Sequence, residues 1–68
     1  MSADNYIHVT KGWAGKYEVR YGFASDEGPG RLVSEHDTLS EALLAAHEYN
    51  RKTGYVEYGV TVDESAAA

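Results

Sequence analysis

The chain has 68 residues, no cysteine and a formal net charge of −5, from six basic and eleven acidic side chains. This length allows one domain with a small core, and the lack of cysteine excludes disulfides and thiolate metal sites. Residues 42–46 form the longest apolar run, far short of the ~20 residues that a membrane span needs. Residues 1–5 do not resemble a secretory signal. We expect one cytoplasmic domain, residues 1–68, that does not bind membranes.

The first part of the chain predicts a β-hairpin. Residues 6–10 alternate around two apolar positions, which is typical of a short strand. Residues 16–23 alternate more clearly, because every second side chain from Tyr17 to Phe23 is apolar. Glycines 12 and 15 between these segments favour a tight turn with positive φ. The apolar face of this hairpin is expected to cover a core.

A helix is predicted over residues 39–52. Thr38 and Glu41 have the spacing of a capping box at its start. Apolar residues then recur at helical intervals. Arg51-Lys52 suits the negative end of the helix dipole, and Gly54 is placed to end the helix.

Two further strands are predicted on either side of this helix. Residues 31–35 follow a Gly-Pro-Gly loop and alternate only weakly. Residues 55–62 alternate well, with Val56, Tyr58, Val60 and Val62 expected to point inward. Residues 64–68 have no such pattern and are expected to be a flexible tail after an ordered part of about residues 5–63.

The order of these elements, β-β-(β)-α-β, predicts an α+β fold. One helix would pack on one face of a three- to four-stranded twisted sheet. A right-handed crossover places the last strand parallel to the first, in the spatial order 4-1-2-3.

No residue pattern indicates catalysis or metal binding. His8, His36 and His47 do not have the i, i+3 or i, i+4 spacing that places two ligands on one helix face. The serines fall in predicted loops or at helix caps, where they commonly bond the backbone. The sequence therefore predicts no catalytic residue, no metal and no cofactor, and a protein that is not an enzyme.

The negative charge is concentrated in the second part of the chain. Residues 1–25 have a net charge of +1, whereas residues 26–68 have a net charge of −6. An acidic field repels nucleic acid and attracts basic protein surfaces, although excess acid can also serve solubility alone. Five acids fall within sixteen residues: Asp26, Glu27, Glu35, Asp37 and Glu41. These five converge on one end of the fold if the third strand and the helix start lie beside the loop, and Glu48 shares a helix face with Glu41.

Aromatic residues are more numerous than a core of this size needs. The chain has six tyrosines and one tryptophan. Trp13 lies at the predicted hairpin tip and Tyr55 on the predicted outer face of the sheet, and neither has an obvious buried position. Trp13 either folds over the edge of the core or, like Tyr55, provides an apolar contact for a partner.

The chain resembles a class of very small phage-encoded proteins. The resemblance lies in Lys16–Val19, Phe23–Glu27, the helix start Leu39–Leu43 and the closing segment Glu57–Val60. In size, acidity and helix-on-sheet build it is also similar to phage anti-CRISPR proteins. Several members of that group block a CRISPR surveillance complex by presenting carboxylates where DNA phosphates would bind.

The resemblance implies a non-enzymatic inhibitor that acts in the bacterial host cell. Its partner would be a basic nucleic-acid channel on a CRISPR-Cas subunit, which it would occupy as a DNA mimic without binding nucleic acid itself. The candidate partner-binding residues are Asp26, Glu27, Glu35, Asp37, Glu41, Glu48, Trp13 and Tyr55. The alternative is a structural module that self-associates through a sheet edge or Trp13, so either a monomer or a weak dimer is expected.

Overall fold

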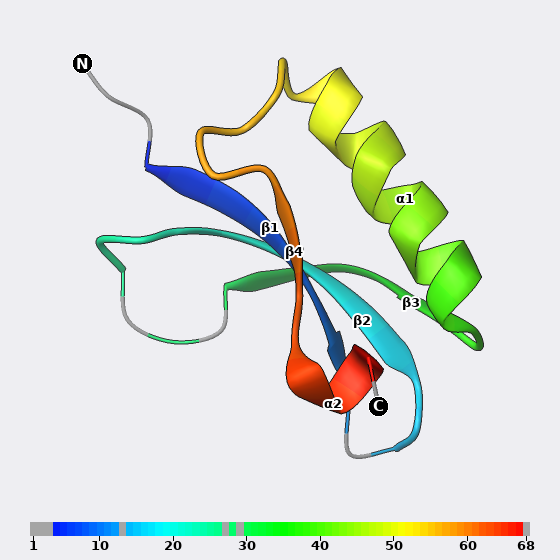
Figure 1. Ribbon diagram of the computed structural model, residues 1–68. Helices are drawn as coiled ribbons and strands as arrows, with labels where there is room; N and C mark the ends of the chain where they lie inside the picture. The colour runs from blue at the N-terminus through cyan, green and yellow to red at the C-terminus, as the bar shows by residue number, and fades with distance from the viewer. Residues whose placement is uncertain (1–3, 13, 27, 29, 68) are drawn as a thin grey trace.

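The computed structural model describes residues 4–12, 14–26, 28 and 30–67. Figure 1 shows a long helix lying across one face of a twisted sheet. The elements are β1 (Asn5–Lys11), β2 (Tyr17–Phe23), β3 (Arg31–His36), α1 (Leu39–Lys52), β4 (Val60–Val62) and the single-turn α2 (Glu64–Ala67). The sheet order is β3-β2-β1-β4, with β4 parallel to β1 and the other pairs antiparallel. The predicted α+β fold and its strand order are confirmed.

The core lies between α1 and the sheet. Ile7 and Val9 of β1 and Val19 of β2 are fully buried against the helix. Ala42 and Ala46 are also fully buried, and their small side chains allow α1 to approach the strands closely. Three partly buried tyrosines pack around these residues: Tyr17, Tyr21 and Tyr49. Among the described residues the fully buried side chains are all aliphatic and none is larger than isoleucine, so this core is small.

Both ends of α1 have the caps that the sequence predicts. The Thr38 hydroxyl accepts a hydrogen bond from the Glu41 backbone N–H at 3.2 Å. At the other end, the backbone N–H of Gly54 donates to the Arg51 carbonyl and that of Tyr55 to the Asn50 carbonyl. Gly54 has φ +86°, and together these features form a Schellman motif. The predicted helix over residues 39–52 is therefore confirmed.

The third strand exists, and a β-bulge explains its weak alternation. Val19 pairs with Ser34 and Arg20 pairs with Leu32, so β3 has one residue more than β2 at this point. The extra residue shifts the inward and outward positions along β3. A strict two-residue pattern therefore does not appear in its sequence.

The last strand is shorter than predicted. The strand covers only Val60–Val62, which lies parallel to β1, and residues 55–59 form a loop. Val56 is buried as expected, but Tyr58 is 59% exposed and Val62 is 40% exposed. The predicted inward positions of these last two side chains are wrong.

Two asparagine side chains hold residues 55–59 as a loop. The Asn50 side-chain carbonyl accepts from the backbone N–H of Val56, and that of Asn5 accepts from the N–H of Glu57, each at 2.8 Å. Tyr55 has φ +67°, outside the range of a strand. The alternation of apolar residues over 55–62 does not predict the contact with Asn5, because Asn5 lies 52 residues before Glu57 in the sequence.

Residues 64–67 form a docked helical turn, which differs from the expected flexible tail. The Asp63 carboxylate accepts from the Ser65 backbone N–H at 3.1 Å and from its hydroxyl at 2.7 Å. The turn places Ala66 in the core, where it is 2% exposed. This turn is stabilised by one buried alanine and the Asp63 cap. It is too short to show the periodic apolar pattern by which longer helices are predicted.

Candidate partner-binding surfaces

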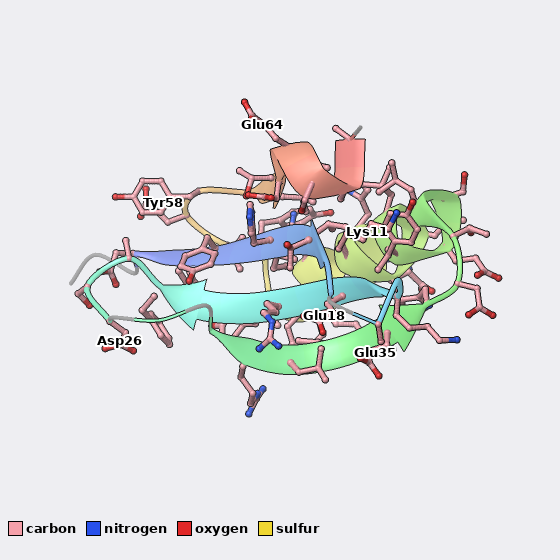
Figure 2. The ribbon with its side chains drawn as sticks, turned by 90° about the horizontal axis from the view of Figure 1, so that it is seen from below. Lys11, Glu18, Asp26, Glu35, Tyr58 and Glu64 are labelled. Atoms are coloured by element: carbon pink, nitrogen blue, oxygen red, sulfur yellow. The ribbon has the colours of Figure 1, made fainter. Side chains whose placement is uncertain are left out.

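The candidate acids lie at opposite ends of the sheet. Because β2 and β3 are antiparallel, the loop that holds Asp26 lies at one end and the β3–α1 turn at the other. Figure 2 shows Asp26 and Glu35 at these two ends. Glu35 is the fifth residue of β3, about 13 Å along the strand from Arg31, and Asp26 lies in the loop before Arg31. The condition for the five acids to converge, that the helix start lies beside this loop, is therefore not met. Glu27 and Trp13 lie outside the described residues.

Three of the predicted acids do lie close together in the chain around the β3–α1 turn. We call Glu35, Asp37 and Glu41 the acidic corner. All three are exposed, at the end of β3, in the turn and in the first turn of α1. Among the described residues, Lys16 forms an ion pair with Asp37, whereas Glu35 and Glu41 are in none of the ion pairs. The positive end of the helix dipole favours the charge of Glu41.

The acidic corner is negative at neutral pH. The hydrogen bond and charge of Lys16 hold the pKa of Asp37 below its usual value of 3.8. Glu18 lies opposite Glu35 on the neighbouring strand. The Arg20 guanidinium forms an ion pair with Glu18 at 3.0 Å, so of these two glutamates Glu35 is the exposed one without an ion pair among the described residues.

Asp26 belongs to a different surface. A hollow of about 410 Å³ at its end of the sheet is lined by residues that include Tyr6, Phe23, Asp26 and Arg31. The Asp26 carboxylate thus shares this surface with a guanidinium and several aromatic rings. Its surroundings are mixed in charge, unlike those of the acidic corner.

Glu48 and Tyr55 meet in a shallow groove on the outer face of α1. Leu43, Leu44, His47 and Arg51 are among the other residues that line it. Arg51 forms an ion pair with Glu48 at 3.0 Å, which reduces the negative charge there. Leu44 is 67% exposed and Tyr55 is 70% exposed. Sequence analysis did not single out Leu44, because it belongs to the same apolar run as the buried alanines.

Two of the three histidines bond to hydroxyl groups that sequence analysis missed. His8 Nδ1 is 2.7 Å from Thr61 Oγ1, and its Nε2 is 3.6 Å from the Asp63 carboxylate. His36 Nε2 is 2.8 Å from Ser34 Oγ. Strand geometry accounts for both contacts, since paired residues and residues i, i+2 share a face. Within the described residues no three potential metal ligands lie together.

Stability should fall in acid as the Asp63 cap is protonated. The hydrogen bonds from the Ser65 hydroxyl and backbone N–H hold the pKa of Asp63 below its usual value of 3.8, with a smaller contribution from His8. A carboxyl with a lowered folded-state pKa stabilises the protein above the unfolded pKa, and this contribution is lost as the pH falls through the folded value. We expect urea midpoints to decrease below about pH 4.

Two variants isolate this effect in urea titrations at several pH values. Asp63→Asn keeps an acceptor for Ser65 but does not titrate, so its midpoint should change less with pH than that of the wild type. Glu64→Gln removes the same charge one residue further on, without removing the cap, and should retain the wild-type pH dependence. Equal acid sensitivity in the wild type and Asp63→Asn would contradict the prediction.

No helix in the described part of the chain is long and apolar enough to cross a membrane. Charge and exposure make the acidic corner and the α1 groove the candidate binding surfaces among the described residues. Comparisons with protein-family models, with curated proteins and with solved structures find no match to this chain.

Proposed function

We propose that the protein is a non-enzymatic inhibitor of the anti-CRISPR kind, which occupies a basic nucleic-acid channel on a CRISPR-Cas subunit. The acidic corner makes the contact, and its carboxylates take the place of DNA phosphates. The observation that supports this proposal is the exposure of Glu35 and Glu41 on either side of Asp37, without ion pairs of their own among the described residues. Carboxylates in this state are free to accept bonds from arginine and lysine side chains.

The contact between Lys16 and Asp37 does not prevent such binding. Both side chains are at least half exposed, and an exposed ion pair contributes only about 0–1 kcal/mol. A partner arginine, which can bond a carboxylate with two parallel N–H groups, is able to displace the lysine. The net charge of −5 then accelerates association with a positive channel.

The test is displacement of labelled target DNA from a panel of purified CRISPR surveillance complexes. The wild-type protein should displace DNA from at least one complex, and raising the salt should weaken this effect. The triple variant Glu35→Gln, Asp37→Asn, Glu41→Gln should weaken it at least about 30-fold, because each charged contact contributes on the order of 1 kcal/mol.

The matched control removes three charges elsewhere. Asp26→Asn, Glu57→Gln, Glu64→Gln has the same net charge as the corner variant and should displace DNA within about 3-fold of the wild type. Circular dichroism should show both variants to be folded. Equal losses in the two variants would rule out the acidic corner as the binding surface. Failure to displace DNA from any complex of the panel would rule out a CRISPR target.

A further inference from the structure

We infer that the outer face of α1 binds a second copy of this chain, with the two helices antiparallel. This interaction goes beyond the proposed function and does not depend on it. Figure 1 shows one side of α1 against the sheet and the other side uncovered. On that uncovered side Ser40, Leu44, His47 and Arg51 form a stripe with spacings of four, three and four residues, all of them exposed. This spacing places the four side chains on one face of the helix, with Leu44 as the apolar member and polar side chains around it.

The charges of α1 favour a second copy in the antiparallel orientation. Glu41 lies in the first turn, and Arg51 and Lys52 lie in the last turn. A twofold axis between Leu44 and His47 places Arg51 opposite Ser40 of the second copy, within reach of the neighbouring Glu41. Arg51 would exchange its exposed ion pair with Glu48 for this contact. The same contact occurs twice, because a twofold interface is isologous. The two helix dipoles also oppose each other in this arrangement.

Tyr55 extends the apolar part of this surface, and its backbone is held by the turn that ends α1. It follows Gly54 in the helix-terminating turn, where its N–H donates to the Asn50 carbonyl at 2.8 Å. Its φ of +67° lies in the left-handed region, which costs a residue other than glycine roughly 1–2 kcal/mol. An exposed aromatic ring in a strained conformation is typical of a binding surface. Tyr55 and Leu44 therefore provide the apolar contacts of the interface.

The size of the surface predicts a weak dimer. The 14 residues of α1 span about 21 Å, so two crossing helices bury less than the ~1,200 Å² of a standard interface. Burying Leu44 and Tyr55 would nevertheless enlarge the apolar area that this small fold removes from water. Glu41 also belongs to the acidic corner, so self-association and a basic partner should compete for it.

The test is sedimentation equilibrium of the full chain from about 10 μM to about 1 mM at low salt, a range that covers weak dimers. The wild type should show a reversible dimer that weakens at high salt. Leu44→Gln should weaken dimerisation at least about 10-fold, because each copy loses an apolar contact. Tyr55→Gly should also weaken dimerisation. The thermal midpoint of this variant should stay the same or rise, because glycine removes the strain at φ +67°.

A charge exchange tests the antiparallel orientation. Arg51→Glu should weaken dimerisation at least about 10-fold, and the double variant Glu41→Arg, Arg51→Glu should restore it to within about 3-fold of the wild type. Lys52→Glu is the matched control, since it makes the same charge change in the same helical turn but does not line the groove. The inference is overturned if the protein is monomeric over the whole range, if the control loses as much as Arg51→Glu, or if the double variant is not restored. None of these readouts involves a CRISPR complex.

Discussion

Replacing Ile7 with alanine is expected to lower the free energy of unfolding by about 2–5 kcal/mol. Ile7 is fully buried in β1, which pairs with β2 on one side and β4 on the other. Alanine would remove apolar contacts and leave a cavity that two hydrogen-bonded neighbours prevent from closing. A domain of 68 residues has a total stability of only roughly 3–10 kcal/mol, so this substitution removes a large fraction of it.

Urea denaturation followed by circular dichroism measures this effect. Ile7→Val keeps most of the side chain and should cost only about 0.5–1.5 kcal/mol. Leu44→Ala removes the same number of carbon atoms as Ile7→Ala, but from an exposed position on α1, and should change stability by less than about 0.5 kcal/mol. A loss from Ile7→Ala no greater than that from Leu44→Ala would contradict the position of the core.

Replacing Gly30 with alanine is expected to cost about 2–5 kcal/mol, for two separate reasons. Gly30 has φ +84°, which disfavours any side chain, and a Cβ there would lie 2.9 Å from the carbonyl oxygen of Tyr21. The oxygen belongs to the backbone of β2, so it cannot move without disturbing the sheet. The Gly30 carbonyl also accepts a hydrogen bond from Arg20 at 2.9 Å, which the same shift would strain.

Gly59→Ala separates the two reasons. Gly59 has φ +70°, but a Cβ there would have no neighbour within 4 Å. The free energy of unfolding of this variant should therefore fall only by the cost of the left-handed conformation, about 1–2 kcal/mol. The difference between the two unfolding free energies, again measured in urea, gives the contribution of the close approach to β2. Equal losses would show that β2 relaxes to accept the side chain.

The arrangement of the acids narrows the form that DNA mimicry could take. A mimic of a long stretch of DNA would need a continuous row of acids that joins Asp26 to Glu35. These two residues lie at opposite ends of the sheet. The acidic corner covers only the turn between β3 and α1, so the proposed contact would replace a few phosphates rather than a long stretch of DNA. Tyr55 lies beyond the opposite end of α1, which assigns it to the groove instead of the corner.

The sequence by itself determined the helix and the strand order. Thr38, Gly54 and the apolar spacing between them define α1 through contacts within a few residues, which local patterns can encode. The β-β-(β)-α-β order and the handedness of crossover connections then leave one favoured strand order, which the structure has.

Only the tertiary structure decided which side chains of the last segment are buried and which acids are neighbours. Asn5 fixes the loop before β4 from a position 52 residues away, and Asp63 and Ala66 dock α2 through one cap and one buried methyl group. Asp26 and Glu35 are close in sequence but lie at opposite ends of the sheet, because β3 carries the chain from one end to the other. Local patterns follow spacing along the chain, whereas burial and electrostatics depend on distances through space that the packing of the sheet and helix determines.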